Sequence, residues 1–143
     1  MKWLSLLGFG AIAVAILLLW QRGALFAPAP WVIIPQAAAV LLMIWARITF
    51  GVRSFHAEAS PTSGGLVTSG PYRYVRHPIY AAICLFVWPC VLAHLSPFTL
   101  SLGALASVGV LVRLFCEEQL IIQRYPEYRA YAQRTKRLLP GLW

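Results

Sequence analysis

The stretch PIYAAICLFVWPCVLAHLSPFTLSLGALASVGVLVRLFCEEQ, residues 78–119, decides the fold. It holds two apolar runs separated by the short segment AHLSPF at residues 93–98. A helix that spans a membrane needs about 20 mostly apolar residues, and each run approaches that length. Because so few residues separate the runs, we expect two antiparallel helices that form a tight hairpin. Such a hairpin brings the residues around Pro78 beside those around Glu117.

The composition of the whole chain indicates a membrane protein. Hydrophobic residues make up 60% of the 143 residues and charged residues 11%, and the mean hydropathy is +0.72. A soluble domain of this size cannot bury so much apolar surface. Two further apolar runs precede the hairpin, so the predicted spans cover residues 3–20, 31–50, 78–95 and 97–116. We therefore predict an all-α fold, an integral membrane bundle of about four transmembrane helices.

The chain reads as one domain over residues 1–143. Its first apolar run follows Lys2, as in a signal peptide, but it exceeds the ~7–15 apolar residues of such a peptide. We therefore expect a retained helix, and we place the two N-terminal transmembrane helices within residues 1–55. The stretch 56–70 is rich in Ser, Thr, Gly and Pro, which predicts a loop rather than a second core.

Positive charge is concentrated on one side of the predicted spans. The net charge is +8, and most Lys and Arg residues lie between the second and third spans or after the fourth. They include Arg53, Arg73, Arg76, Arg124, Arg129, Arg134, Lys136 and Arg137. Because positive residues near helix ends mark the cytoplasmic side, we predict a multi-pass protein with both termini in the cytoplasm. These charges suit anionic lipid head groups rather than nucleic acid, and we expect residues 119–143 to form an interfacial segment.

Polar side chains interrupt the apolar pattern at the open end of the hairpin. They are Arg76, His77 and Tyr80 on one side, and Arg113, Glu117 and Glu118 on the other. Arg113 and Glu117 are four residues apart, so they share one helical face. One interpretation is an ion pair at a helix end; the other is a ligand site, since ionisable residues at membrane depth face a cavity or the protein interior. A site with both signs of charge suits a zwitterionic ligand.

The cysteines and the remaining histidines predict no metal or disulfide site. Cys84, Cys90 and Cys116 are scattered within predicted helices, without CxxC spacing or a nearby pair of histidines. We expect them to pack as small apolar residues. His56 and His94 have no comparable polar setting, so we assign them no function.

Two motifs flank the hairpin: GLVTSGPYRYVRHPIY at residues 65–80 and EEQLIIQRYPEYRAYAQRTKRLLPG at residues 117–141. Together they resemble the superfamily of isoprenylcysteine carboxyl methyltransferases and phospholipid methyltransferases, integral membrane enzymes that use S-adenosylmethionine. The resemblance covers residues 64–141 and implies that this region binds the cofactor and catalyses methyl transfer. The first two helices carry no family signature. The pattern departs from the family at Ala82, Tyr125-Pro126 and Thr135-Lys136-Arg137, and none of these changes removes a charged residue from the proposed site.

The resemblance implies a role for each motif position, and the charge cluster adds Arg76 and Glu118 to the cofactor site. The expected cofactor-binding residues are Gly64, Gly65, Leu66, Val67, Tyr72, Arg76, His77, Pro78, Ile79, Tyr80, Glu117 and Glu118. Glu117 aligns with the carboxylate that holds the cofactor, and Arg113 aligns with an arginine that contacts the methyl acceptor. We therefore expect Arg113 and Glu117 to be the catalytic residues and Arg113 to bind the substrate.

The chemistry of methyl transfer fits these side chains. The reaction is an in-line displacement, and holding the reacting atoms collinear in a dry site provides most of the catalysis without a metal. The ring of Tyr72 or Tyr80 is a candidate for a cation–π contact with the sulfonium. A carboxylate acceptor needs no general base, and Arg113 would orient it. A thiol or amine acceptor must lose a proton, which makes Glu118 or His77 a candidate base.

The acceptor and the alternatives stay open at this point. We expect a lipophilic or prenylated acceptor, most like a prenylcysteine carboxylate, with a phospholipid amine or a small thiol as alternatives. A sterol-type membrane reductase that uses NADPH shares the RHP-x-Y pattern but carries Asn after the proline, where this chain has Ile79. A non-catalytic membrane protein is the remaining class. The sequence is silent on oligomeric state.

Overall fold

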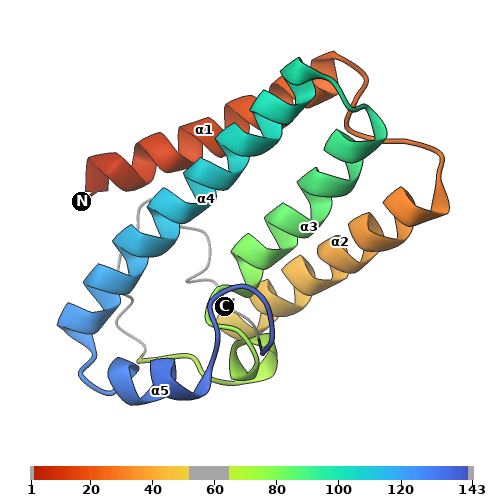
Figure 1. The fold of residues 1–143 in the computed structure, drawn as a ribbon. Helices are drawn as coiled ribbons and strands as arrows, with labels where there is room; N and C mark the ends of the chain where they lie inside the picture. The colour runs from red at the N-terminus through yellow and green to blue at the C-terminus, as the bar shows by residue number, and fades with distance from the viewer. Residues whose placement is uncertain (1, 52–64, 142–143) are drawn as a thin grey trace.

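The computed structural model describes residues 2–51 and 65–141, and the described chain is helical (Figure 1). Its elements are α1 (Lys2–Gln21), α2 (Pro30–Phe50), the 3-10 turn η2 (Gly70–Arg73), α3 (Pro78–Ala93), α4 (Pro97–Arg124) and α5 (Tyr128–Arg134). Among the described residues there is no strand, and the only extended pairing is an isolated parallel bridge between Val75 and Lys136. The predicted all-α fold is confirmed.

Local sequence explains where the helices of the hairpin begin. Proline occupies the first turn of α2, α3 and α4, where its missing N–H costs no helical hydrogen bond and its fixed φ favours the helix. Ser96 caps α4: its hydroxyl accepts a hydrogen bond from the Thr99 N–H at 3.1 Å, and the Thr99 hydroxyl accepts one from the Ser96 N–H at 3.0 Å. Only residues 94–96 separate α3 from α4, so the tight hairpin forms as expected.

Three helices, α1, α2 and α4, are long and apolar enough to cross a membrane. Helix α3 has 16 residues, which gives about 24 Å against a hydrocarbon core of about 30 Å. Helix α4 has 28 residues and continues past the predicted end at residue 116 to Arg124. Glu117 and Glu118 therefore lie inside a regular helix, two turns before its end.

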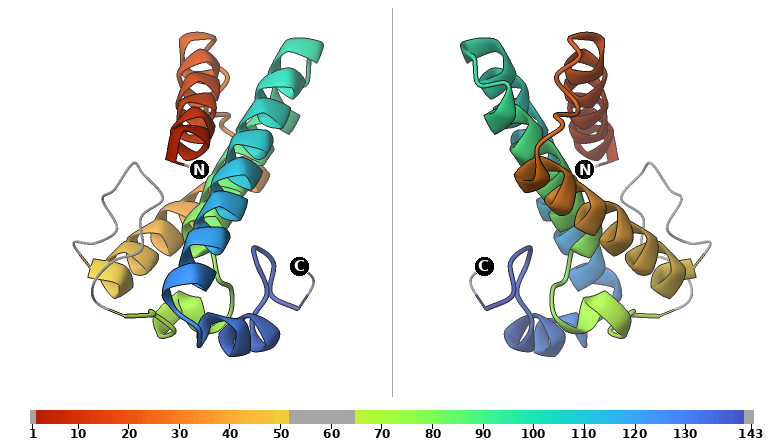
Figure 2. Two further views of the ribbon diagram at one scale, coloured as in Figure 1. Left: turned by 90° about the vertical axis from the view of Figure 1, so that its left-hand side faces the viewer. Right: turned by 90° about the vertical axis from the view of Figure 1, so that its right-hand side faces the viewer.

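The α3–α4 hairpin is the centre of the bundle, with α1 packed on α4 and α2 packed on α3 (Figures 1 and 2). One apolar cluster joins α1, α3 and α4 through buried residues such as Leu19, Val91 and Ala106. A second cluster contains Ile12, Tyr80, Val110 and Leu114. It lies directly beside the polar residues of the hairpin, because Tyr80 belongs to both groups.

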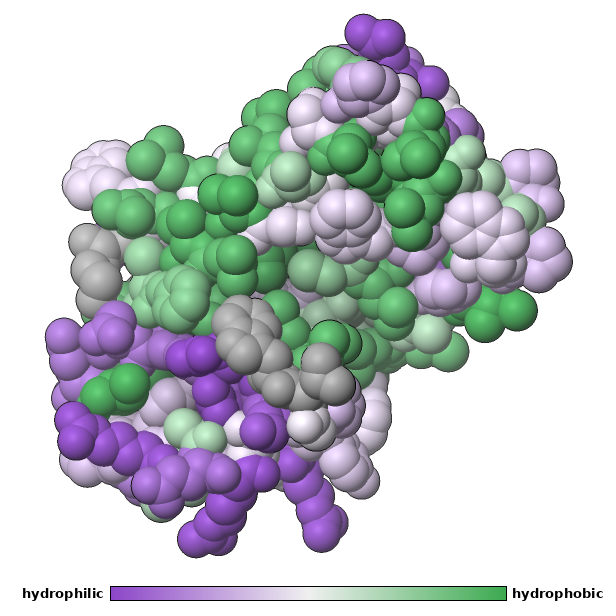
Figure 3. Space-filling model, viewed as in Figure 1, coloured by the Kyte–Doolittle hydropathy of each residue, from purple (hydrophilic) through white to green (hydrophobic). Residues whose placement is uncertain are grey.

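Apolar and polar surface are segregated along the bundle (Figure 3). Large apolar side chains on α1 and α2 are exposed, including Leu7 at 73%, Ile34 at 67% and Ile48 at 75%. The hydrophilic surface gathers at the end that carries α5 and the last turns of α4 (Figure 3). In a membrane protein such apolar faces contact lipid, so the polar end of the hairpin lies where the helices leave the lipid.

Candidate functional site

The start of α3 and the last third of α4 meet in a network of charged and aromatic side chains, as the hairpin predicts. Arg113 Nε donates a hydrogen bond to the Tyr80 hydroxyl oxygen at 2.8 Å, and Tyr80 donates its proton to the Glu117 carboxylate. Arg113 Nη2 donates to Glu117 Oε1 at 3.3 Å. The Arg113 side chain is 7% exposed and that of Glu117 is 25% exposed. Glu117 is therefore the carboxylate of this group that a ligand can reach.

Glu118, the next residue, has a different environment. Its Oε1 accepts hydrogen bonds from Arg76 Nε at 3.0 Å and from the Tyr128 hydroxyl at 3.1 Å. The same oxygen lies 3.3 Å from His77 Nε2. Its Oε2 accepts a hydrogen bond from Arg137 Nε at 3.1 Å. The Glu118 side chain is 8% exposed. A buried carboxylate is stable only when it is paired and hydrogen-bonded, and here four partners meet that need while tying three chain segments together.

His77 lies between the two carboxylates. Its side chain is 4% exposed; Nε2 faces Glu118, and Nδ1 lies 3.9 Å from Glu117 Oε2. The imidazole stacks on the Tyr80 ring with centroids 5.7 Å apart. The imidazole therefore lies between the outer carboxylate and the buried one, with Nε2 within hydrogen-bond distance of Glu118.

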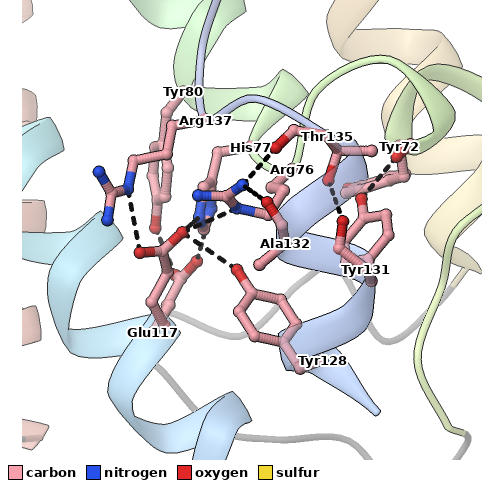
Figure 4. Close-up of polar contacts among 11 residues, drawn as sticks. Tyr72, Arg76, His77, Tyr80, Glu117, Tyr128, Tyr131, Ala132, Thr135 and Arg137 are labelled. Atoms are coloured by element: carbon pink, nitrogen blue, oxygen red, sulfur yellow. Dashed lines mark hydrogen bonds and ion pairs between the residues drawn. The ribbon is translucent and has the colours of Figure 1, made fainter. Parts of the chain in front are cut away.

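The chain after α5 runs along the segment before α3. Arg76 N–H donates to the Lys136 carbonyl at 2.7 Å, and His77 N–H donates to the Arg137 carbonyl at 3.0 Å. The Arg76 guanidinium also donates to the Ala132 carbonyl at 2.8 Å and to the Thr135 carbonyl (Figure 4). The C-terminal segment is therefore built into the polar end and fixes the direction of Arg76 and His77.

Three tyrosines near this junction are held neutral by their surroundings. Burial raises the pKa of the Tyr131 phenol to about 12. Burial, followed by the nearby carboxylate of Glu117 or Glu118 respectively, raises the pKa of Tyr72 and of Tyr128. A neutral phenol can donate, and Tyr131 does so to the Tyr72 carbonyl (Figure 4). Tyr128 and Tyr131 therefore act as hydrogen-bond donors across the physiological pH range.

The remaining predicted site residues occupy the approach to α3. Gly64 lies outside the described residues, and Gly65, Leu66 and Val67 form an irregular stretch before η2. Tyr72 is buried in η2. Pro78 is buried in the first turn of α3, and Ile79 is half-buried. The cofactor contacts of these residues stay a prediction.

Sequence reasoning missed the C-terminal members of the network: Tyr128, Tyr131, Thr135 and Arg137. They were predicted as part of an interfacial segment that could also cover the cofactor pocket, but their individual partners were not predicted, because contacts between separate segments leave no periodic pattern in the sequence. The single sequence signal was the departure from the family pattern at residues 135–137. Residues 2–51 and 65–141 contain no group of three or more His, Cys, Asp or Glu side chains placed to hold a metal ion, and the three cysteines are free.

The sequence matches the phospholipid methyltransferase family over residues 31–128. The chain belongs to this family. Members of the phospholipid methyltransferase family generally use S-adenosylmethionine, and the family indicates a membrane methyltransferase. The match includes α3, α4 and the site residues Arg76, His77, Arg113, Glu117 and Glu118, whereas α1 and Arg137 lie outside it. It also includes α2 from residue 31, so the prediction that the first two helices carry no family signature is wrong for the second.

Two curated proteins are similar to this family member. One is the nickel-cobalt-cadmium resistance protein NccN of Alcaligenes xylosoxydans xylosoxydans, 32% identical over 81 residues that cover 54% of this chain and 37% of the relative. The other is the cobalt-zinc-cadmium resistance protein CzcN of Cupriavidus metallidurans, 32% identical over 83 residues that cover 54% and 36%. The chain thus spans little more than a third of the length of these curated relatives. No solved structure matches it.

Proposed function

We propose that the protein transfers a methyl group from S-adenosylmethionine to a lipophilic acceptor at the cytoplasmic end of the bundle. The observation that carries the proposal is the linked group Tyr80, Arg113 and Glu117, which joins α3 to α4 within the stretch matched to the family. This group lies beside helices whose outer faces are apolar. A lipophilic acceptor can therefore reach it from the membrane while the cofactor enters from water.

The side chains at the polar end of the hairpin match the chemical groups of the cofactor. S-adenosylmethionine carries an ammonium, a carboxylate, ribose hydroxyls and a purine, and when bound it supplies an electrophilic methyl group on a sulfonium. In the proposal Glu117 accepts hydrogen bonds from the ammonium or the hydroxyls, because its carboxylate is the accessible one. Tyr72 and Tyr80 offer ring faces to the cationic part. The stretch 64–67 and residues 76–80 complete the cofactor site, with Glu118 holding Arg76 and His77 in place.

Arg113 is the proposed acceptor residue. It lies one turn before Glu117, further towards the membrane core, where the polar end of a lipophilic molecule would stop. A planar guanidinium orients a carboxylate through paired hydrogen bonds, so we favour O-methylation of a prenylcysteine-like carboxylate. Such an acceptor is already ionised and needs no base.

An amine or thiol acceptor would need a group that removes a proton. His77 and Glu118 are the candidates, and the geometry favours His77. The four partners of Glu118 occupy its lone pairs, whereas His77 reaches towards the accessible carboxylate of Glu117. Phospholipid amines and small thiols are therefore the alternative acceptors, with His77 as the base.

Labelled methyl transfer tests this proposal. Purified full-length protein in lipid nanodiscs is incubated with S-adenosylmethionine labelled in the methyl group and with prenylcysteine analogues, aminophospholipids or hydrophobic thiols in separate reactions. Label should enter the prenylcysteine carboxylate as a base-labile ester. Transfer only to an amine or thiol would replace the preferred acceptor, and no transfer to any class would contradict the proposed function.

A further inference from the structure

Helix α1 contacts Arg113, although it lies outside the stretch matched to the family. Arg113 Nη1 donates to the backbone carbonyl of Ser5 at 3.4 Å. The guanidinium carbon of Arg113 lies 5.4 Å from the centre of the Phe9 ring. Ser5 and Phe9 are four residues apart, so one face of α1 presents both groups to the arginine.

The backbones of α1 and α4 touch next to these contacts. A Cβ atom on Gly8 would lie 2.8 Å from the Gly109 carbonyl oxygen and 3.0 Å from Arg113 Cγ. A Cβ on Gly109 would lie 2.6 Å from the Gly8 carbonyl oxygen. Real Cβ atoms do not approach other atoms so closely, so both positions require glycine. Small residues allow membrane helices to approach in this way, and here the approach places α1 against the stem of Arg113.

Arg113 is held from the other side by α3 and by its own helix. Tyr80 accepts from its Nε at 2.8 Å, and Glu117 accepts from its Nη2 at 3.3 Å. The guanidinium is thus fixed between α1 and the two residues proposed to contact the cofactor. A shift of α1 would therefore turn the guanidinium relative to Tyr80 and Glu117.

We propose that α1 is a positioning element of the acceptor site, in which Gly8 and Phe9 set the orientation of Arg113. This inference rests on the proposed function. Phe9 and Gly8 are positioning residues, since they act on the acceptor through Arg113. Phe9 is 48% exposed towards the membrane, so its ring also borders the side from which a lipophilic acceptor approaches.

The aromatic contact is tested by Phe9→Leu, with Phe98→Leu as the matched control. Phe98 is 39% exposed, and its ring lies 4.5 Å from the guanidinium carbon of Arg22 at the opposite end of α4. Phe9→Leu should lower kcat/KM for the acceptor roughly fivefold to tenfold, the worth of one partly desolvated cation–π contact. The Kd for S-adenosylmethionine should stay within about twofold. Phe9→Tyr should restore turnover, and Phe98→Leu should leave it unchanged.

The helix contact is tested by Gly8→Ala, with Gly10→Ala as the control on the same helix. A Cβ at Gly10 meets nothing within 4 Å, so both variants gain the same helix propensity but only Gly8→Ala forces α1 away from α4. Gly8→Ala should lose acceptor turnover and Gly10→Ala should keep it. If Gly8→Ala does not fold, the Phe9 variants decide the question.

A double-mutant cycle separates this inference from the proposed function. Phe9→Leu combined with Arg113→Gln should lower the unfolding temperature by less than the sum of the single changes, because either change alone already removes the cation–π contact. This readout needs no acceptor. If the wild-type protein transfers no methyl group but the cycle is non-additive, the proposed function fails while the contact between α1 and Arg113 stands. Strict additivity, or equal effects of Phe9→Leu and Phe98→Leu on turnover, would overturn the role of α1.

Discussion

The two ends of the α3–α4 hairpin are held together in different ways. At the turn end, Ser96 and Thr99 form a local capping box, and His94 Nδ1 lies 3.1 Å from the Cys90 carbonyl oxygen. At the polar end, the side-chain contacts of residues 76–80 with α4 join residues 33 to 42 positions apart, as between Tyr80 and Arg113 or between Arg76 and Glu118. Local contacts such as those at the turn end are enough to close a hairpin.

The charges at the polar end therefore exceed what closing the hairpin requires. Buried ion pairs are weak sources of stability, because the cost of desolvation offsets much of their attraction. Two arginines, two carboxylates and a histidine meet here with side chains that are 25% exposed or less. We propose that such a group holds a ligand with charges of its own, and for this reason the proposed reaction is placed at this end.

The largest expected effect is on folding and comes from Glu118→Gln. The variant keeps the shape of the side chain but leaves Arg76, whose side chain is 9% exposed, beside a neutral amide. Breaking a buried pair in this way should reduce the free energy of unfolding by about 3–5 kcal/mol. Denaturant unfolding in lipid nanodiscs measures the change. Glu127→Gln, at an exposed carboxylate, is the control; equal stability of the two variants would contradict the structural role of Glu118.

The next effect is on turnover and comes from Arg113→Lys. Lysine keeps the charge but loses the planar fork that positions a carboxylate. The transition state should therefore lose about 2 kcal/mol of stabilisation, which lowers kcat roughly thirtyfold. The affinity for S-adenosylmethionine should stay near the wild-type value. Labelled methyl transfer and isothermal titration measure the two quantities on one preparation. Wild-type turnover would exclude an acceptor role, and equal losses of both would assign Arg113 to the cofactor.

A smaller effect on cofactor affinity is expected from Glu117→Gln. The change preserves size and removes the charge of the more exposed of the two carboxylates. Binding of S-adenosylmethionine should weaken by about 1–3 kcal/mol, the usual worth of a hydrogen bond to a charged group. His77→Ala should weaken it as well. If both variants fold and bind the cofactor as tightly as the wild type, the proposed cofactor site is wrong.

The smallest effect is expected at the turn end, from Ser96→Ala. The variant removes the hydroxyl that caps α4, which should reduce the free energy of unfolding by about 1 kcal/mol. Cofactor affinity and turnover should be unchanged, because no contact links Ser96 to the described part of the polar end. A loss of cofactor binding in this variant would remove the distinction between the two ends.

The sequence predicted the hairpin and its charged residues well, for a physical reason. Apolar runs of membrane-spanning length have only one way to fold in lipid, and a turn of a few residues forces them to be antiparallel. The meeting of Tyr80 with Arg113 and Glu117 follows from that geometry. The apolar run of the fourth span ends at residue 116, whereas α4 continues to Arg124 and so carries Glu117 and Glu118 on a regular helix, as the shared helical face of Arg113 and Glu117 predicts.

The contacts that could not be predicted all depend on how separate segments cross. The pairing of residues 75–77 with residues 136–137 joins two irregular stretches whose hydrogen bonds are backbone to backbone, so side-chain identity carries no signal. The contact of Gly8 with Gly109 depends on where α1 crosses α4. Glycines are common in membrane helices, and nothing in the sequence marks these two as partners.

Calorimetric titration of the wild-type protein in lipid nanodiscs with S-adenosylmethionine, and separately with NADPH, tests the central claim most directly. If the polar end of the hairpin is a methyltransferase site, S-adenosylmethionine should bind saturably, and NADPH should give no binding heat. Glu117→Gln should weaken the binding of S-adenosylmethionine, and Ser96→Ala should not. Binding of NADPH alone would indicate a reductase, and binding of neither molecule would contradict an enzymatic site at this end of the bundle.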